Sequence, residues 1–172
     1  MIEGPRNIGF GAGHNRILKN LKSDIHLIIN PDVIFQKKSI SLLVEFLGHN
    51  SSAVAAGPEG LDESGQPALL PKRYPSILAL AIRGSGSAWL RNIFMSYLAR
   101  YEYAGLSNKI PEQVELLSGC CIAARTPILK TVGGFDERFF LYFEDFDLAI
   151  RLTTAVKPEL TKSANCISTM DL

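Results

Sequence analysis

The sequence predicts an α/β fold in which helices flank a mixed, mainly parallel sheet. The segment IHLIIN, residues 25–30, is a continuous apolar run, and such runs are typical of strands buried on both faces of a parallel sheet. A helix pattern and a second short apolar segment follow it directly. The 172 residues, of which 47% are hydrophobic, are enough for one domain with its own core.

The first half of the chain contains four predicted segments. A strand over 25–30 ends at Pro31, which lacks the N–H that a sheet ladder needs. Ser39 is a candidate N-cap for a helix over 40–47. A short strand is predicted over 52–57. The stretch 58–76 is rich in proline, glycine and polar residues, so it is predicted to be a loop or hairpin.

The second half continues this alternation. A helix is predicted over 88–101 and a strand over 114–125. Thr126 and Pro127 begin a short helix over 127–132, which the pair Gly133-Gly134 ends. A last helix is predicted to start near Glu144. The pattern weakens beyond it, so we expect one domain over 1–152 and an irregular tail over 153–172.

Overall composition argues against several classes of protein. A net charge of +1 gives no reason to expect a nucleic-acid partner. Three cysteines without a CxxC pattern fit a reducing compartment, and the adjacent pair Cys120-Cys121 is predicted to be buried in a strand. No secretory signal and no apolar stretch of ~20 residues is visible. These features predict a cytoplasmic protein, with peripheral contact at the inner membrane face left open.

Two segments near the N-terminus are candidate ligand sites. Asp32 follows the most buried predicted strand, at the sheet edge where α/β proteins collect ligands, and an aspartate there can bind a divalent cation that bridges phosphates. Its alternative is a turn, because Asn-Pro-Asp is good turn chemistry. The segment NIGFGAGHN, residues 7–15, suggests a phosphate loop; its alternative is a glycine-rich turn that leads into a helix over 14–21.

A cluster of acids lies in FFLYFEDFDLAIRL, residues 139–152. Glu144, Asp145 and Asp147 fall in the first turn of a predicted helix, where they meet the macrodipole favourably, and Asp147 can pair with Arg151. Alternatively, the five neighbouring aromatic residues shield the acids from water. Shielding raises carboxylate pKa values and suits an acid to accept a proton near neutral pH.

Taken in chain order, NIGFGAGHN, INPDV and LLSGCCIAARTPILKTVGGFDERFFLYFEDFDLAIRL resemble the inverting family 2 glycosyltransferases, particularly their rhamnosyltransferase-like branch. The resemblance runs from about Asn7 to Leu152 and is most specific between Gly133 and Arg151. It implies a GT-A-like, Rossmann-like fold and a nucleotide-diphosphate sugar donor. It also implies a glycan or lipid-linked acceptor in cell-surface polysaccharide synthesis, with rhamnose as the suggested sugar.

The same resemblance implies roles for individual residues. Asp145 is the catalytic base, with Glu144 beside it, and a single displacement inverts the anomeric centre. Asp32 holds Mg²⁺ or Mn²⁺ against the donor diphosphate. The implied donor-side residues are Asn7, Gly9, Asn15, Asn30 and Asp32, and the implied acceptor-side residues are Gly134, Phe135, Asp136 and Glu137.

The chain departs from that family at both ends. Family members begin with a strand–helix unit of roughly 60–80 residues that forms the nucleotide-base pocket, whereas NIGF starts six residues after Met1. A histidine that can join the metal site usually follows the base helix, and none does here. We therefore expect a partial GT-A domain, truncated at the N-terminus. The alternatives are an inactive remnant that binds a glycan or a partner, and an α/β domain with an unrelated metal-dependent role.

The predicted helix over 88–101 has an aromatic and aliphatic face. Trp89, Phe94 and Tyr97 lie on it, and Arg83, Arg91 and Arg100 are near. Such a helix can lie at an anionic lipid surface. The alternative is that this face packs against the sheet or a second subunit.

Overall fold

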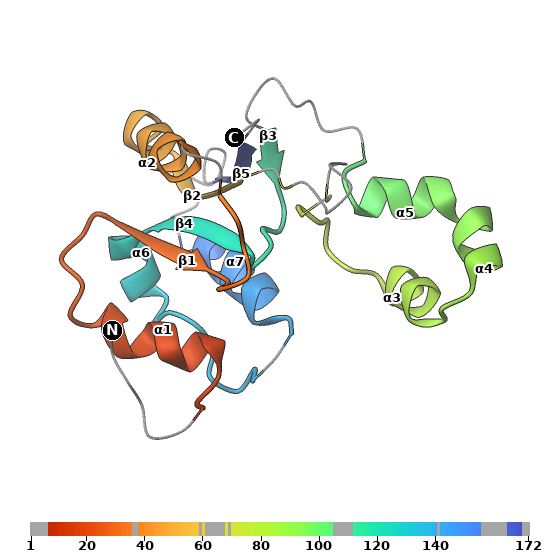
Figure 1. Cartoon of the computed structure of the whole chain (residues 1–172), viewed down its shortest axis with the longest axis horizontal. Coiled ribbons are helices and arrows are strands. Elements are labelled where there is room, and N and C mark those ends of the chain that lie inside the picture. Colours follow the sequence, from red (N-terminus) through yellow and green to blue (C-terminus); the bar gives the residue numbers. More distant parts are fainter. Residues whose placement is uncertain are drawn as a thin grey trace.

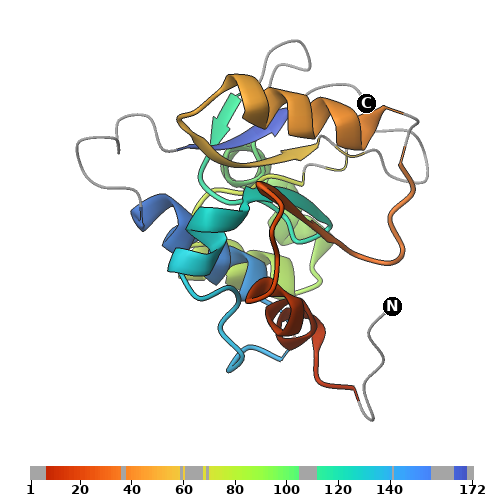
Figure 2. The same cartoon turned by 90° about the vertical axis from the view of Figure 1, so that its left-hand side faces the viewer.

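The computed structural model describes residues 7–35, 38–58, 60, 68, 70–104, 112–140, 142–155 and 165–169. A central sheet lies between α2 on one side and α1, α6 and α7 on the other (Figure 1, Figure 2). The helices are α1 (Phe10–Leu18), α2 (Ser39–His49), α3 (Ile77–Gly84), α4 (Ala88–Ile93), α5 (Met95–Tyr101), α6 (Thr126–Thr131) and α7 (Glu144–Thr154). The strands are β1 (Ile25–Ile29), β2 (Ala53–Pro58), β3 (Glu112–Val114), β4 (Cys121–Arg125) and β5 (Asn165–Thr169).

The sheet has the strand order β1-β4-β2-β5-β3. Among the described strands, β1–β4, β2–β4 and β3–β5 pair antiparallel, and β2–β5 pairs parallel. The sheet is therefore mixed as predicted, but the prediction that it is mainly parallel is wrong. An apolar run reports that both faces of a strand are buried; it does not report the direction of the neighbouring strands, which the connections set.

Two hydrophobic clusters cover the two faces of this sheet. On one face, Leu43 and Leu47 of α2 pack over alanines of β2 and β4. On the other, side chains of α1, α6 and α7, including Leu129 and Leu148, pack against Ile28 and Ile122. Burying each large aliphatic side chain contributes roughly 1.5–3 kcal/mol, so this double coverage holds the three layers together.

Arg125, the last residue of β4, joins the sheet to the end of α2. Its guanidinium donates to the carbonyl oxygens of Leu47 at 2.6 Å, Asn50 at 2.9 Å and Ala53 at 2.8 Å. The last carbonyl groups of a helix accept no hydrogen bond from within the helix. Arg125 satisfies carbonyl groups at and just beyond the end of α2, and thereby sets the turn that leads into β2.

Several predicted elements are confirmed. The strands over 25–30 and 52–57 are β1 and β2, and the helices over 40–47 and 127–132 are α2 and α6. The predicted caps Ser39 and Thr126 are wrong: each is the first residue inside its helix, and neither side chain caps it. The last predicted helix, α7, begins at Glu144. The prediction that Cys120 and Cys121 are buried in a strand holds for Cys121 alone, whose burial raises the pKa of its thiol to about 11; Cys120 is half-buried in the turn before β4.

Other local predictions are wrong. The first helix begins at Phe10 rather than residue 14, so residues 10–15 of the glycine-rich segment are helical. The predicted strand over 114–125 is a strand only at 121–125: β3 ends at Val114, and residues 115–120 lie between the two strands, with a turn at 119–120. The predicted helix over 88–101 breaks at Phe94, whose φ of −99° and ψ of 21° end α4. The sequence predicts an irregular tail over 153–172, yet residues 165–169 form β5; most of the remaining tail lies outside the described residues.

Helices α3, α4 and α5 form a helical arm, residues 77–101, that extends to one side of the three layers (Figure 1). The sequence does not predict α3 as a helix. Ser76 and Ser87 cap α3 and α4, each accepting a backbone N–H three residues later. No helix in the described part of the chain is long and apolar enough to cross a membrane.

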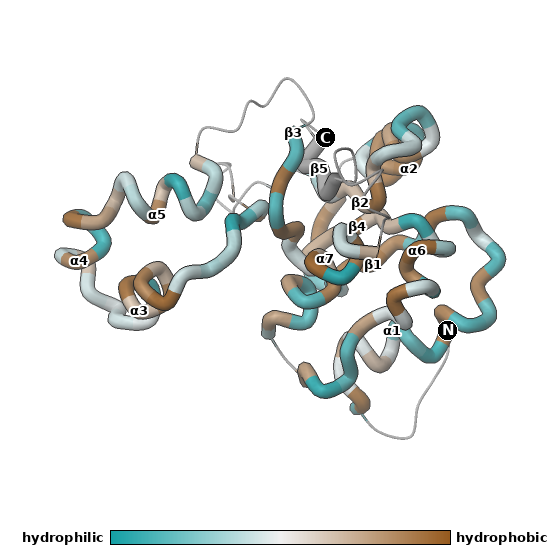
Figure 3. The backbone as a smooth tube through the Cα atoms, turned by 180° about the vertical axis from the view of Figure 1, so that it is seen from behind, coloured by the Kyte–Doolittle hydropathy of each residue, from teal (hydrophilic) through white to brown (hydrophobic). Residues whose placement is uncertain are grey.

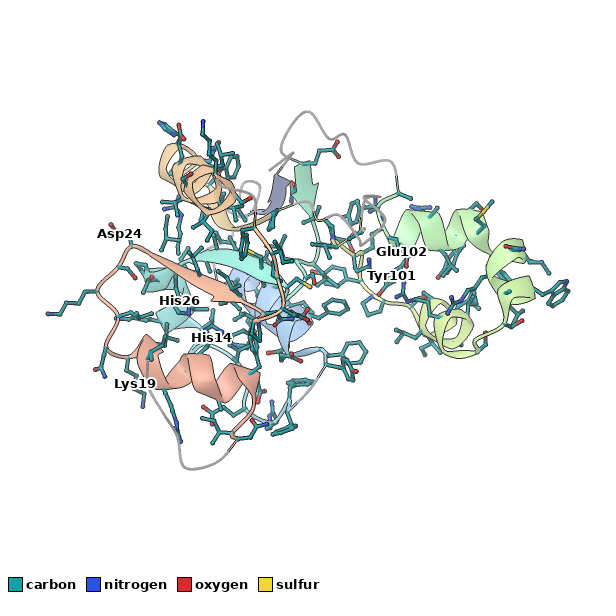
Figure 4. All side chains as sticks on the ribbon, in the orientation of Figure 1. His14, Lys19, Asp24, His26, Tyr101 and Glu102 are labelled. Carbon is teal, nitrogen blue, oxygen red and sulfur yellow. The ribbon has the colours of Figure 1, made fainter. Side chains whose placement is uncertain are left out.

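Two histidines connect α1 to β1 (Figure 4). His14 Nδ1 and His26 Nε2 are 3.0 Å apart, so one ring donates to the other. Burial, and to a smaller extent the neighbouring His26, lowers the pKa of His14 from 6.5 to about 4. Burial also lowers the pKa of His26. Both rings are therefore neutral at pH 7, which suits a contact between two imidazoles.

We expect the fold to lose stability as the pH falls from about 6.5 to about 4, because unfolded His14 takes up a proton near 6.5 and folded His14 only near 4. The unfolded state binds more protons across this window, so the free energy of unfolding decreases as the pH falls. The contribution of His14 to stability is fully present above the window. The loss should be on the order of 1 kcal/mol, since solvent partly screens the rings.

Urea melts at several pH values measure this dependence. His14→Gln should make it shallower, and His49→Gln, which removes an exposed histidine of α2, is the matched control. Parallel curves for the wild-type chain and His14→Gln would contradict the assignment.

Candidate functional site

A turn at Ser118–Cys120 brings two separate motifs together. The backbone N–H of Asn30, which opens the Asn-Pro-Asp turn, donates to the carbonyl oxygen of Cys120 at 3.0 Å. The N–H of the preceding residue, Gly119, donates to Oδ2 of Asp145 at 2.7 Å. The end of β1 and the start of α7 are 115 positions apart in the sequence, yet this single turn contacts both.

Asp145 is held in one orientation by backbone groups. Besides the bond from Gly119, its Oδ1 accepts the N–H of Phe146 at 2.9 Å. A glycine at position 119 favours this contact, because an added Cβ would lie 3.2 Å from the Cβ of Asp145, which is tighter than ordinary van der Waals contact. The side chain is only partly buried, so the carboxylate is both oriented and reachable by another molecule.

Glu144, beside Asp145, has an unusual environment. Its Oε2 is buried, and it has no hydrogen-bond partner among the described residues. Buried carboxylate oxygens are almost always hydrogen-bonded. The first turn of α7 thus carries two different carboxylates. Backbone N–H groups hold that of Asp145, whereas Oε2 of Glu144 has no donor among the described residues.

The backbone that enters α7 is strained. Tyr142 and Phe143 both have φ of 64°, in the left-handed region that non-glycine residues rarely adopt. Such strain costs on the order of 1–3 kcal/mol per residue and clusters at functional sites. Here the two residues turn the chain sharply into the helix that carries Glu144 and Asp145.

The prediction that aromatic residues shield this acid cluster from water is wrong. Phe140 and Tyr142 are 63% and 72% exposed, and Phe139 and Phe143 are exposed as well. Phe146 alone of the five is partly buried, with its ring edge-on to Phe143. The sequence pattern could not show that the four rings before Asp145 face solvent where the strained turn at 142–143 leads into α7.

The predicted pairing of Asp147 with Arg151 is confirmed. Arg151 Nε and Nη2 lie 2.8 and 2.6 Å from Asp147 Oδ2. Arg151 Nη1 also donates to the carbonyl oxygens of Val132 at 2.9 Å and Gly134 at 2.6 Å. Asp147 therefore aims Arg151 at the glycine loop after α6, so α7 positions that loop as well as the two acids.

Asn15 of α1 holds the same loop from its other side. Its Oδ1 accepts the N–H of Phe135 at 2.9 Å, and its Nδ2 donates to the carbonyl oxygen of Phe135 at 2.8 Å and to Glu137 Oε1 at 3.0 Å. Asn15 is thus a positioning residue for the loop. That it also binds a donor stays a prediction.

Close packing joins the rest of the 7–15 segment to this loop. A Cβ at Gly9 would lie 3.3 Å from the ring of Phe140, and one at Gly11 only 2.7 Å from the Cβ of Phe135. Asn7 accepts the N–H of Gly9 through its Oδ1 at 2.9 Å. Gly9 and Gly11 therefore allow α1 to pack closely against the loop. A hollow of about 400 Å³ lies beside this contact and is lined by Asn7, Ile8, Ala12, Arg16 and Glu137.

Asp136 is half-buried in this loop, beside the exposed Arg138. The guanidinium of Arg138 donates to it at 2.6–3.0 Å, and this hydrogen bonding lowers the pKa of Asp136 to about 2. Asp136 is therefore ionised at any physiological pH, and its charge is already shared with a cation.

Asp32 is exposed in the turn after β1, as the turn interpretation of Asn-Pro-Asp predicts. Within the described residues, no three His, Cys, Asp or Glu side chains lie close enough to hold a metal ion together. Asp32 could offer one carboxylate to an ion that has other ligands.

Sequence reasoning missed two functional contacts. It did not identify Gly119 as the partner of Asp145, although a glycine inside an apolar strand-like run is a signal for close backbone approach. It also did not anticipate that Arg151 reaches the loop carbonyl groups, because that contact depends on how α6 and α7 pack.

Comparison with known proteins gives one kind of relative. No protein-family model matches the chain. The chain is 31% identical over 161 residues to N-acetylglucosaminyl-diphospho-decaprenol L-rhamnosyltransferase from each of two strains of Mycobacterium tuberculosis. The match covers 87% of this chain and 51% of the relative, so the chain spans about half the length of the curated relatives it matches. This similarity supports a relationship to glycosyltransferases.

Alanine substitutions in the glycine loop should separate backbone strain from packing. Gly133 and Gly134 have φ of +78° and +74°, so an alanine costs roughly 1–2 kcal/mol at either position. At Gly134 the new Cβ would also lie 2.2 Å from Asn15 Oδ1, whereas at Gly133 it meets nothing within 4 Å.

We therefore expect Gly134→Ala to lower the free energy of unfolding by about 1–3 kcal/mol more than Gly133→Ala. Urea denaturation of the two variants side by side measures the difference. Equal losses would show that the contact with Asn15 does not hold the loop.

Proposed function

We propose that this chain carries the catalytic part of a glycosyltransferase. It transfers a sugar from a nucleotide-diphosphate donor to a lipid-linked or other glycan acceptor, with inversion at the anomeric carbon. The observation that carries the proposal is the contact of one turn, Ser118–Cys120, with both the Asn-Pro-Asp turn and Asp145. The similarity to rhamnosyltransferases named for a decaprenol-linked N-acetylglucosamine acceptor supports the reaction class and suggests rhamnose as the sugar.

Asp145 acts as the general base in this reaction. It removes the proton from an acceptor hydroxyl as the hydroxyl oxygen attacks the anomeric carbon. The new C–O bond forms while the bond from that carbon to the diphosphate oxygen breaks, and the diphosphate leaves with the electron pair. One base and one displacement invert the centre. The N–H of Gly119 keeps the carboxylate in a fixed orientation, which favours productive geometry.

Asp32 holds Mg²⁺ or Mn²⁺ together with the donor diphosphate. Mg²⁺ in proteins is commonly bound through one or two carboxylates plus substrate phosphates rather than a full protein cage. A single exposed carboxylate in a turn beside the site fits that mode. When bound, the ion stabilises the negative charge of the departing diphosphate.

The donor lies along residues 7–15 and 30–32, and the acceptor along residues 134–137. The hollow that Asn7 and Arg16 line with Glu137 touches both proposed regions, which supports their proximity. The exposed rings of Phe140 and Tyr142 offer a surface on which the apolar face of a sugar can stack.

Replacing the proposed base tests the mechanism. With a nucleotide-diphosphate rhamnose donor and an N-acetylglucosaminyl-diphosphate lipid acceptor, Asp145→Asn should lower turnover at least about 100-fold. An asparagine can still accept the Gly119 N–H, so the melting temperature and donor affinity should change little. Asp24→Asn, an exposed acid before β1, is the matched control.

Retained turnover in Asp145→Asn would remove Asp145 from the role of base. If the wild-type chain binds the glycan but shows no turnover with any donor, the chain is a glycan-binding domain instead.

The metal assignment has its own test. Calorimetry with a nucleoside diphosphate and Mn²⁺ should show weak binding that Asp32→Ala reduces at least about tenfold. The same titration without Mn²⁺ should no longer distinguish the two proteins. Asp24→Ala, at the opposite end of β1, is the control. Metal-dependent affinity that survives Asp32→Ala would contradict the assignment.

A further inference from the structure

The helical arm, residues 77–101, exposes an unusual amount of apolar surface. Ile77, Trp89 and Met95 are 89%, 69% and 66% exposed. Leu78, Leu80, Ile93 and Tyr97 are exposed as well. Figure 3 shows apolar stretches along α3, α4 and α5, on the part of the chain that extends from the layers. Single exposed apolar residues need no explanation, but a concentration on one element marks an interaction surface.

The arm gains little stability from its own packing. Ala79, Ile82 and Tyr101 are the buried residues of its three helices, and α4 has none. Isolated helices shorter than about 12 residues are marginal in water, and these helices have 8, 6 and 7 residues. A surface that covers the exposed side chains would stabilise the arm.

Charge indicates the kind of surface. The arm itself, residues 77–101, has three basic residues, Arg83, Arg91 and Arg100, and no acid; Glu102 follows it directly. At the root of the arm, Arg73 pairs with Glu115. Arg83 pairs with Glu102, and Arg91 Nη2 donates to the carbonyl oxygen of Arg83 at 3.1 Å. Two copies of so basic an arm would repel each other, whereas an anionic surface would attract it.

We propose that the helical arm docks in the headgroup region of an anionic lipid bilayer. Trp89, Ile93 and Met95 enter the boundary between headgroups and acyl chains, and Arg91 and Arg100 contact lipid phosphates. Short amphipathic helices with aromatic and basic residues bind membranes in this way, without crossing them. The role of this docking rests on the proposed function, because an enzyme would encounter a lipid-linked acceptor at such a surface. The test of docking itself does not require turnover.

The root of the arm is tied to the candidate site. Arg73 N–H donates to the carbonyl oxygen of Tyr101 at 2.9 Å, and Lys72 and Leu116 exchange two backbone hydrogen bonds of 3.2 and 3.1 Å. Leu116 lies three residues before Gly119, the partner of Asp145. Figure 4 shows Tyr101 and Glu102 where the arm meets the layers. A docked arm would therefore bring lipid headgroups close to the proposed base.

Trp89 is the only tryptophan of the chain, so its fluorescence reports on the arm alone. We expect a blue shift of Trp89 emission on adding phosphatidylglycerol vesicles, quenching by brominated acyl chains, and co-sedimentation that weakens with salt. Pure phosphatidylcholine vesicles should bind at least about tenfold more weakly.

Two pairs of variants test the residues involved. Arg91→Glu with Arg100→Glu should weaken vesicle binding at least about tenfold; Lys19→Glu with Lys22→Glu, an equal charge change away from the arm, should preserve it. Ile93→Ser with Met95→Ser should also weaken binding, whereas Leu42→Ser with Val44→Ser on exposed α2 should not. Circular dichroism confirms that each variant is folded.

Three results would overturn the proposal: no blue shift with anionic vesicles, equal binding to neutral vesicles, or a dimer in solution that Ile93→Ser with Met95→Ser dissociates. Vesicle binding without any transferase activity would instead count against the proposed function alone.

Discussion

The hydrogen bond from Gly119 to Asp145 connects the parts of the molecule on which the site depends. It links the turn before β4, which belongs to the sheet, to the first turn of α7, which lies on one face of that sheet. The neighbouring residue, Cys120, accepts a hydrogen bond from the turn after β1. The approach is close, since a Cβ at position 119 would lie 3.2 Å from the Cβ of Asp145. One small residue therefore allows three distant segments to share a short stretch of backbone.

A second set of contacts makes the loop after α6 rigid without regular structure. Asn15 satisfies both backbone groups of Phe135, and Arg151 satisfies the carbonyl groups of Val132 and Gly134. Buried or half-buried loop backbone needs such partners, since unpaired polar groups are costly. Side chains from α1 and α7 thus take the place of a sheet ladder or helix, which is how a glycine-rich loop keeps one conformation beside the acids.

The molecule combines well-packed sheet layers with a helical arm whose apolar side chains are largely exposed. The sheet buries apolar side chains on both faces, while the helical arm leaves many of its own in solvent. The rings next to Asp145 are also exposed. The rings lie just before Asp145 in the chain, and the root of the helical arm is hydrogen-bonded to Leu116, three residues before Gly119. Both exposed surfaces are therefore connected to the turn that holds Asp145.

Local sequence determined what local physics controls. Apolar runs, proline and glycines predicted β1, α2, β2, α6 and the start of α7, and the i, i+4 spacing predicted the pair Asp147–Arg151. The tertiary structure alone decided strand direction, because burial on both faces is the same for parallel and antiparallel neighbours. It also decided that the aromatic residues before Asp145 face solvent, because two left-handed residues redirect the chain there. Contacts such as Gly119–Asp145 depend on segments that meet only after the layers have packed, and no spacing along the chain encodes them.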